Sequence, residues 1–315
     1  MRGWAMATKI EVRKHYYLNR KAIISFARGL RPKDFEPVVS VKGKKCPFCP
    51  GNEEPYLENG RYEENGKWIV RWINNKFPAF SPDATARISK GLLQQNPGRG
   101  WHEVILETPV HGKPIYELSD IDLTRVFQTF QDRIHALYKR PGVKYVVLFK
   151  NFGPESGATI AHEHSQVLAQ EFVPNDVAEK VAALSKKKGC FYCKNDEMKS
   201  RRRVTQNKHF VAFTPYAPRF NNELWIVPRR HVKMLTELSE EELGSLATLL
   251  KKLLPKVMKL ADSYNMLFFD APKGKDMHFH IEICPRGSIW AGYEFLAGDY
   301  IISVAPEVSA EFYRR

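Results

Sequence analysis

The sequence predicts an α+β fold made of two diverged copies of one domain, each with a mostly antiparallel sheet and one long helix. Three observations predict it. A strand-like segment that ends at a histidine occurs twice at a constant offset of 120 residues, at 103–111 (EVILETPVH) and 223–231 (ELWIVPRRH). Each segment is followed by one amphipathic helix and then by a second apolar run. Strands and helices therefore alternate only sparsely, which favours an α+β arrangement.

The two helices are predicted to begin after Ser119 and Ser239. Each serine is followed three residues later by an acidic residue, Asp122 or Glu242, in the pattern of a capping box. Apolar residues then recur at helical spacing over 123–137 and 243–257. Each helix is therefore expected to bury one face.

The remaining repeated elements complete the two copies. The apolar runs 145–149 (YVVLF) and 266–269 (MLFF) predict strands, and each leads through a glycine-containing loop to a His-x-His sequence. The polar, lysine-rich stretch 179–208 is the expected join. We therefore divide the chain into residues 1–178 and residues 179–315.

Composition indicates a globular protein and restricts the kinds of partner that it can bind. The 315 residues, 43% of them hydrophobic, are enough to bury a sizeable core. The net charge of +14 favours an anionic partner, but only 186–188 and 201–203 form basic runs, so we expect a small molecule rather than nucleic acid. A solvated basic surface is the alternative. No segment has the roughly 20 apolar residues of a membrane helix or the pattern of an export signal, so we expect a cytoplasmic protein that binds no membrane.

Four of the five cysteines form two Cys-x-x-Cys pairs, which in this context indicate metal binding or redox chemistry. Zinc prefers thiolate and imidazole ligands, and a structural site takes all four from protein. Each copy offers such a set in the same order. The expected zinc ligands are Cys46, Cys49, His111 and His162 in the first copy, and Cys190, Cys193, His231 and His278 in the second.

The segment 151–166 (NFGPESGATIAHEHSQ) carries the candidate chemistry. In a strand, alternate residues face the same side, so His162, His164 and Gln166 are expected to project together. A neutral His164 imidazole that attacks phosphorus would form a phosphoramidate and divide one transfer into two steps. Gln166 can donate a hydrogen bond to the phosphoryl group, and the glycine loop before it can offer peptide N–H groups.

HEHSQ after an Asn-Phe-Gly loop resembles the active-site strand of galactose-1-phosphate uridylyltransferases, which double the domain of the histidine-triad superfamily. The resemblance extends over nearly the whole chain. It implies that His164 is uridylylated, that Gln166 stabilises the uridylyl group, and that the fold is a duplicated histidine-triad-like domain. It further implies phosphate contacts for Asn151 and Thr159.

Other motifs match the same family in order and spacing. Arg28 and Arg31 resemble its N-terminal arginine pair, and Asn75 and Phe77 lie in its nucleoside-contacting segment. The sequence 292–294 resembles the C-terminal sugar-binding motif, which in the family reaches the active site of the partner subunit. The resemblance therefore implies substrate contacts for Tyr293 and Glu294 and a homodimer.

Departures from the family pattern concern the substrate and the second metal. Glu163 replaces a proline inside the His-x-His motif, and Lys76 stands where many members have an aspartate. Ser288 and Tyr300 replace a usual lysine and glutamine of the hexose pocket. Lys180 occupies the place of an iron-binding carboxylate of some members, so the second metal set resembles that of the plant branch acting on ADP-glucose.

Three functions follow from these patterns. The first is a ping-pong uridylyl transfer between UDP-glucose and galactose 1-phosphate, that is, between a nucleotide sugar and a sugar 1-phosphate. The second is adenylyl transfer by an ADP-glucose phosphorylase or a dinucleoside-polyphosphate adenylyltransferase. The third is a zinc-containing nucleic-acid-binding protein without turnover. The second His-x-His (His278 and His280) lacks the glutamine, which favours a degenerate copy over a second nucleophile.

Overall fold

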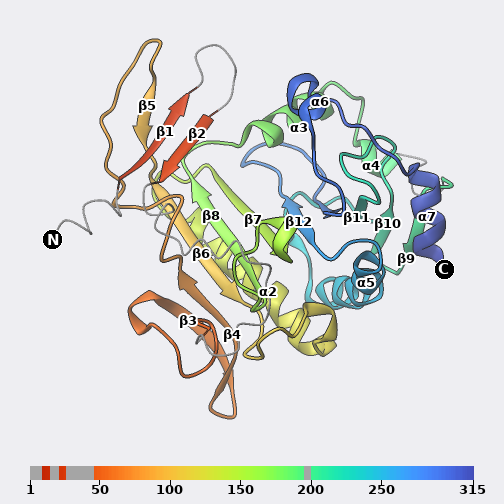
Figure 1. Cartoon of the computed structure of the whole chain (residues 1–315), viewed down its shortest axis with the longest axis horizontal. Coiled ribbons are helices and arrows are strands. Elements are labelled where there is room, and N and C mark those ends of the chain that lie inside the picture. The colour runs from red at the N-terminus through yellow and green to blue at the C-terminus, as the bar shows by residue number, and fades with distance from the viewer. Residues whose placement is uncertain (1–8, 15–20, 26–45, 195–199) are drawn as a thin grey trace.

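The computed structural model describes residues 9–14, 21–25, 46–194 and 200–315 (Figure 1). The strands are β1 (Ile10–Lys14), β2 (Lys21–Ser25), β3 (Glu58–Glu64), β4 (Lys67–Asn74), β5 (Gln95–Pro97), β6 (Gly100–Leu106), β7 (Tyr145–Phe152), β8 (His164–Gln170), β9 (Arg203–Gln206), β10 (Phe210–Phe213), β11 (Leu224–Pro228), β12 (Tyr264–Phe269) and β13 (His280–Pro285). The α-helices are α2 (Asp120–Tyr138), α3 (Asn175–Ser185), α4 (Phe191–Lys194), α5 (Glu240–Met258), α6 (Gly292–Ala297) and α7 (Pro306–Arg314). Short 3-10 helices are η2 (Pro55–Leu57), η3 (Ile115–Glu117), η4 (Pro154–Ser156) and η6 (Leu235–Glu237).

One large antiparallel sheet organises the described part of the chain. Its ten strands lie in the order β3-β4-β6-β8-β7-β12-β13-β11-β10-β9. Outward from the centre, β7, β8, β6 and β4 are mirrored by β12, β13, β11 and β10, and the two halves meet where β7 pairs with β12. The α+β fold with a mostly antiparallel sheet is thus confirmed. A smaller sheet, β2-β1-β5, stands to one side of it (Figure 1).

The position of the boundary between the copies stays a proposal. Residues 178 and 179, where we divide the chain, both lie within α3. The large sheet runs continuously from the strands before this helix to those after it. The repeat in the sequence, rather than a break in the sheet, supports the division.

Both long helices begin as predicted. The Ser119 hydroxyl accepts the Asp122 N–H at 3.0 Å, and the Ser239 hydroxyl accepts the Glu242 N–H at 3.3 Å. The Glu242 carboxylate in turn accepts the Ser239 N–H at 2.7 Å, and the two hydrogen bonds form a capping box. At the first helix the shorter Asp122 carboxylate instead accepts the Ser119 hydroxyl at 2.7 Å, so the box there is not reciprocal.

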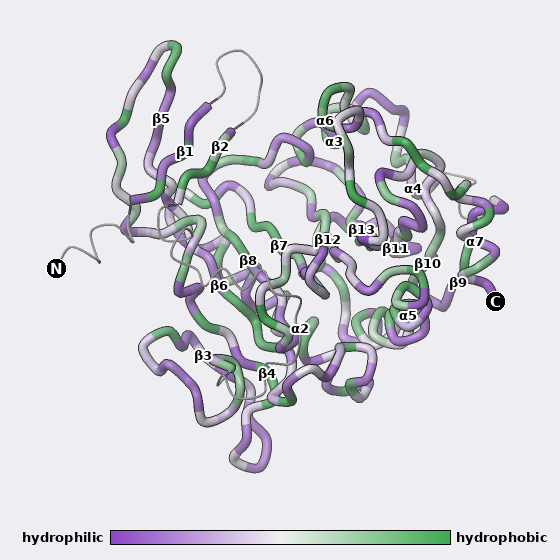
Figure 2. Tube along the Cα trace, viewed as in Figure 1, coloured by the Kyte–Doolittle hydropathy of each residue, from purple (hydrophilic) through white to green (hydrophobic). Residues whose placement is uncertain are grey.

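The main core lies where α2 and α5 pack on each other and on one face of the large sheet. The apolar stripe of each helix, predicted from its spacing, is buried there, and Figure 2 shows the apolar segments along both helices. Residues from the central strands of both copies, such as Leu148, Val167, Phe268 and Ile281, join the same cluster. The halves therefore share one core. No helix among the described residues has the length and apolar character needed to cross a membrane.

Asp270 is a buried carboxyl at the end of β12, where its Oδ1 accepts the Leu235 N–H at 2.8 Å. Burial raises its pKa from 3.8 to about 7. Because the folded pKa lies above the unfolded one, the protonated group stabilises the fold fully below pH 3.8, and this contribution is lost as the pH rises to about 7.

We expect Asp270→Asn to remove this titration. Relative to wild type, the variant should gain about 1–3 kcal/mol of unfolding free energy between pH 5 and pH 8, since one pKa unit corresponds to about 1.4 kcal/mol. Urea unfolding of both proteins at several pH values measures the difference. Parallel stability curves over this range would contradict the prediction.

Candidate active site and metal clusters

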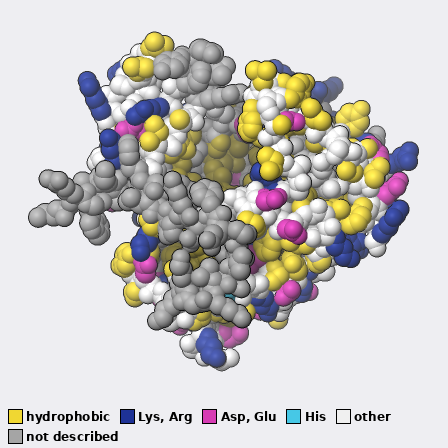
Figure 3. Space-filling view, in the orientation of Figure 1, with side chains coloured by type: hydrophobic (Ala, Val, Ile, Leu, Met, Phe, Trp, Pro, Cys, Tyr) yellow, Lys and Arg dark blue, Asp and Glu magenta, His cyan; other side chains and the backbone are white. Residues whose placement is uncertain are grey.

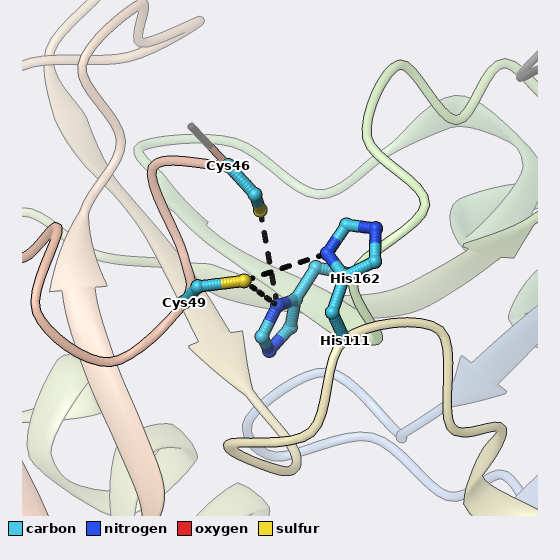
Figure 4. Close-up of side chains that lie close together, drawn as sticks. All are labelled: Cys46, Cys49, His111 and His162. Carbon is cyan, nitrogen blue, oxygen red and sulfur yellow. Dashed lines mark hydrogen bonds between the residues drawn. The ribbon is translucent and has the colours of Figure 1, made fainter. Parts of the chain in front are cut away.

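Four predicted metal ligands of the first copy converge on one point (Figure 4). Cys46 and Cys49 come from the loop before η2, His111 from the loop after β6, and His162 from the segment just before β8. The Nδ1 of His162 lies 3.8 Å from Cys46 Sγ and 3.6 Å from Cys49 Sγ, and His111 Nδ1 lies 3.5 Å from Cys49 Sγ. All four ligand atoms lie within 4.8 Å of one another. The cluster could hold a metal ion.

The chemistry of this donor set fits a cation. The His162 Nε2–H donates to the Thr108 carbonyl at 2.7 Å, which leaves Nδ1 without a proton and directed at the cysteines. A tetrahedral ion with Zn–S of about 2.3 Å and Zn–N of about 2.0 Å would hold sulfur and nitrogen about 3.5 Å apart. Without a cation, burial and the neighbouring Cys46 raise the pKa of Cys49 to about 11. A bound cation would favour the thiolate instead.

The second copy repeats the cluster with Cys190, Cys193, His231 and His278, again within 4.8 Å of one another. His278 Nδ1 lies 3.4 Å from Cys190 Sγ and 3.5 Å from Cys193 Sγ, while its Nε2–H donates to the Pro228 carbonyl at 2.9 Å. His231 is oriented by a carboxylate, since its Nε2 lies 2.9 Å from Asp276 Oδ1. The described cysteines form no disulfide.

His164 is the first residue of β8 and is buried. Its Nδ1 lies 2.8 Å from the His162 carbonyl oxygen, which can only accept, so Nδ1 carries the proton. The lone pair is therefore on Nε2. Burial lowers the pKa of His164 to about 4, and the nearby Lys150 acts in the same direction. The imidazole is thus neutral at neutral pH, as an attack on phosphorus requires.

Phe48, inside the first Cys-x-x-Cys pair, links the metal cluster to His164. Its ring lies edge-on to His164 at a centroid distance of 5.4 Å and to His162 at 6.1 Å. It also packs against the apolar residues of β4 and β6 beneath them. The loop that carries two of the candidate metal ligands therefore also contacts the candidate nucleophile.

Gln166, two residues after His164 on β8, is linked to Asn75 through His102. Gln166 shares the strand face of His164, and its Oε1 lies 2.9 Å from His102 Nε2. The Asn75 Nδ2 lies 3.2 Å from the same nitrogen, while Asn75 Oδ1 accepts the Phe77 N–H at 2.8 Å. The structure thus brings two parts of the predicted site together, the Asn75–Phe77 segment and Gln166.

The glycine loop of the first copy rests on residues of the second. Gly153 has φ 79°, and a Cβ there would lie 2.3 Å from the Ser263 Oγ. That hydroxyl accepts the Glu155 N–H at 3.2 Å. Asn151 is held in the same way, because the Asn265 side-chain amide donates to its Oδ1 at 2.8 Å. Thr159, farther along the loop, is exposed.

The other predicted substrate contacts lie elsewhere. Tyr293 and Glu294 are on α6, which Figure 1 places apart from β8. Tyr293 is 51% exposed, and the Glu294 carboxylate accepts the Ala291 N–H at 2.9 Å, where it caps the helix. Arg28 and Arg31 lie outside the described residues.

The second His-x-His has the same local geometry but a different neighbour. The His280 Nδ1–H donates to the His278 carbonyl at 2.9 Å. Its Nε2 lies 3.2 Å from the Lys180 ammonium, which also pairs with Glu282 at the place of Gln166. The His280 ring stacks on Phe269 at 4.9 Å. The nitrogen lone pair that is available in the first copy is occupied by Lys180 here.

Glu163, between the two histidines of the first copy, is buried with Lys150 and Glu107 on the helix side of the sheet. The Lys150 Nζ lies 2.5 Å from Glu107 Oε2, pairs with Glu163, and lies 3.4 Å from the His164 carbonyl oxygen. Burial alone would lower the pKa of Lys150, but the two carboxylates raise it. Ser165 completes the group by donating to Glu107 at 2.5 Å.

Three of these residues are not identified by the sequence patterns: Phe48, His102 and Lys150. A lysine directly after an apolar strand run is a visible signal that a charge enters the core. His102 carries no such signal, since its contact with Gln166 depends on the pairing of β6 with β8. The prediction that His162, His164 and Gln166 lie in one strand needs one correction. Strand β8 begins at His164, so His162 lies before it.

Comparison with known proteins gives two family matches. Residues 27–174 match the model described as galactose-1-phosphate uridyl transferase, N-terminal domain. Residues 117–311 match a model described as a domain of unknown function, DUF4921.

Individual relatives cover most of the chain. It is 31% identical over 263 residues to a galactose-1-phosphate uridylyltransferase of Thermotoga maritima, covering 79% of this chain and 83% of the relative. It is 29% identical over 326 residues to an ADP-glucose phosphorylase of Arabidopsis thaliana, covering 96% of this chain and 92% of the relative. The crystal structure of an ADP-glucose phosphorylase from Arabidopsis thaliana with bound ADP-glucose superposes with a TM-score of 0.77, at 29% identity over 98% of both chains.

Proposed function

The chain belongs to the galactose-1-phosphate uridylyltransferase family, and from this premise we propose that it transfers a nucleoside monophosphate through His164. The observation that carries the proposal is the contact of 2.8 Å between His164 Nδ1 and the His162 carbonyl oxygen. Because Nδ1–H is bound to the His162 carbonyl, the lone pair of Nε2 is left for phosphorus.

The proposed reaction has two balanced steps. His164 Nε2 attacks the α-phosphorus of a nucleotide sugar, the N–P bond forms, and the bond from phosphorus to the sugar-phosphate oxygen breaks. The sugar 1-phosphate leaves with that electron pair. A phosphate oxygen of the acceptor then attacks the same phosphorus, and the N–P electrons return to Nε2. No proton has to move to either leaving group, which suits the amide of Gln166 as a hydrogen-bond donor.

Substrate binding is assigned in outline. The proposed phosphate contacts are Asn151, Thr159, Arg28, Arg31 and peptide groups of the 153–159 loop. We place the nucleoside beside Asn75 and Phe77, whose segment contacts Gln166 through His102. Support for a nucleotide-sugar ligand comes from the similar Arabidopsis protein, whose structure contains ADP-glucose.

Our first candidate reaction is uridylyl transfer between UDP-glucose and galactose 1-phosphate, the activity named for the Thermotoga relative. The second candidate is that of an ADP-glucose phosphorylase, or of a related dinucleoside-polyphosphate adenylyltransferase. It is favoured by the second Cys/His cluster, which resembles that of the plant branch acting on ADP-glucose. Lys76, which pairs with Glu54 at 2.9 Å where many uridylyltransferases have an aspartate, leaves both bases open. Both reactions use His164 in the same way.

Intact-protein mass spectrometry tests the proposal. The protein is incubated briefly and separately with UDP-glucose and ADP-glucose, at neutral or alkaline pH because a phosphoramidate is acid-labile. A uridylyl adduct supports the first candidate and an adenylyl adduct the second. If neither donor leaves an adduct, covalent nucleotidyl transfer is wrong for this chain, and a binding protein without turnover becomes the better interpretation.

Zinc is the proposed ion for both clusters, because each supplies two thiolates and two imidazoles at tetrahedral separations. With four protein ligands, neither ion has an open position for substrate, so both are structural. They would fix the loops that carry Phe48 and Tyr192 against the two His-x-His segments.

We expect Cys46→Ser and Cys193→Ser each to lose about one zinc per chain, because a structural site needs its four ligands. The consequences should differ. Cys46→Ser frees the loop against His164 and should also reduce adduct formation, whereas Cys193→Ser should lower thermal stability and keep the adduct. Zinc analysis, thermal unfolding and adduct mass measure these effects. Full zinc content in either variant would contradict the assigned ligands.

A homodimer is proposed from the surface around α6. Large apolar side chains gather there, including Ile289, Tyr293, Phe295, Leu296 and Ile301, and Leu296 is 89% exposed (Figure 3). Contiguous exposed apolar surface of this kind marks interaction sites. A second copy of the chain would cover it and bring Tyr293 and Glu294 toward a partner's nucleotide. Native mass measurement should give a dimer for the wild type and a monomer for Leu296→Glu.

A further inference from the structure

His102 connects the two parts of the proposed site that bind the nucleoside and the phosphoryl group. It lies on β6, is buried, and faces the same side of the sheet as Gln166 on the neighbouring strand. Its Nδ1 lies 3.0 Å from the Ala79 peptide nitrogen, and its Nε2 lies 2.9 Å from Gln166 Oε1.

The contact with the Ala79 N–H determines the proton position on the ring. The Ala79 N–H can only donate, so Nδ1 accepts and carries no proton. A neutral imidazole then has its single proton on Nε2, where Gln166 Oε1 is the acceptor. The Asn75 Nδ2, 3.2 Å from the same nitrogen, is itself a donor and therefore makes no hydrogen bond to it. The amide oxygen of Gln166 is thereby committed to His102. Within the part of the chain that the structure describes, no hydrogen bond takes the NH₂ of the same amide.

We propose that His102 is a positioning residue that fixes the orientation of the Gln166 amide, with the oxygen toward β6 and the NH₂ toward the phosphoryl group on His164. The proposal rests on the proposed function. The torsion that ends in the amide is broad and two-fold, so little else would prevent an exchange of the oxygen and the NH₂. With the oxygen facing the phosphoryl oxygens, the contact would be repulsive instead of stabilising.

Two substitutions separate this role from simple support of the Ala79 segment. His102→Asn retains an acceptor near the Nδ1 position for the Ala79 N–H but is too short to reach Gln166. His102→Gln places an NH₂ near the Nε2 position and can donate to Gln166 Oε1. We expect His102→Asn to slow adduct formation about 10- to 100-fold, a part of what loss of a complete charge-stabilising donor costs, with little change in KM. His102→Gln should recover most of the rate.

The measurement is the single-turnover rate of adduct formation, with zinc content and circular dichroism as controls for folding. Whichever of UDP-glucose or ADP-glucose labels the wild type is used as the donor. The loss in His102→Asn should also disappear in a Gln166→Met background, where no amide remains to be oriented.

Several results would overturn the proposal while leaving the proposed function intact. These are a wild-type rate in His102→Asn, a milder effect in His102→Asn than in His102→Gln, or an undiminished effect in the Gln166→Met background. The second result, with a raised KM, would assign His102 to support of the nucleoside segment instead. If the wild type forms no adduct with either donor, the proposed function fails and this inference fails with it.

Discussion

Replacing His164 with glycine is expected to abolish the nucleotidyl adduct and to lower turnover by about 10⁴-fold or more, the scale seen when a covalent nucleophile is removed. The reason is chemical, since no other described side chain on this strand face offers a neutral nitrogen with a free lone pair. Folding should survive the change. His164 is not one of the four residues of the metal cluster, and among the described residues its side chain makes one polar contact, to the His162 carbonyl. Adduct mass, steady-state rates and zinc content measure the effect.

The second copy supplies a matched control. His280 occupies the equivalent position and donates to its own neighbouring carbonyl in the same way, but Lys180 occupies its other nitrogen. His280→Asn should therefore keep the adduct and most of the turnover. An adduct that persists in His164→Gly, or one that is lost in a folded, zinc-loaded His280→Asn, would show that the wrong histidine has been assigned.

Replacing Lys150 with methionine should lower the free energy of unfolding by about 3–5 kcal/mol, the usual cost of leaving buried charges without their partner. Lys150 is fully buried and is the counter-charge for both Glu107 and Glu163. Without it, two carboxylates face each other in the core next to the His164 strand. Denaturant unfolding measures the loss.

Two further variants make this result specific. Lys144→Met removes an exposed lysine just before the same strand and should change stability by less than about 0.5 kcal/mol. Adding Glu107→Gln and Glu163→Gln to Lys150→Met removes the unpaired charges and should recover a large part of the loss. A small effect of Lys150→Met, or no recovery in the triple variant, would mean that the ion pairs contribute little.

The second copy has apolar residues at the positions of this charge cluster. Lys150 pairs with Ser165 across β7 and β8, and the equivalent pair across β12 and β13 is Phe268 with Ile281. Aligning the two His-x-His sequences places Glu163 opposite Phe279, which is buried in the core. The second copy, which is apolar at these positions, has His280 in contact with Lys180. The first copy, which has the buried charges, has His164 with an available lone pair. Glu163, which departs from the proline of the family, is thus part of a structure confined to the candidate catalytic half.

Local sequence patterns predicted the starts of the two long helices and the members of the two metal clusters. Ser119 and Ser239 place both helix starts, because a cap depends on residues within one turn. The eight cysteines and histidines of the clusters could be grouped because the order of motifs repeats, although their separations could not. The family resemblance, carried by HEHSQ and the glycine loop, is confirmed by the comparisons.

What escaped prediction depends on contacts between distant segments. His102 meets Gln166 only through the register of β6 against β8, and a shift of one residue would turn it to the other face. Lys150 meets Glu107 across three strands and a loop. Local periodicity predicts neither the strand register nor the path of a loop, so the contacts of these residues could be identified only from the structure.

The pairing of β7 with β12 makes the support of the glycine loop independent of protein concentration. It brings Ser263 and Asn265 of one copy under the glycine loop of the other. Between separate single-copy subunits such support would weaken as the protein becomes scarce. Here both partners lie on one covalent chain, so the support acts at a fixed effective concentration and has no dissociation constant. The second copy can therefore support the loop although Lys180 occupies the nitrogen of its own histidine, His280.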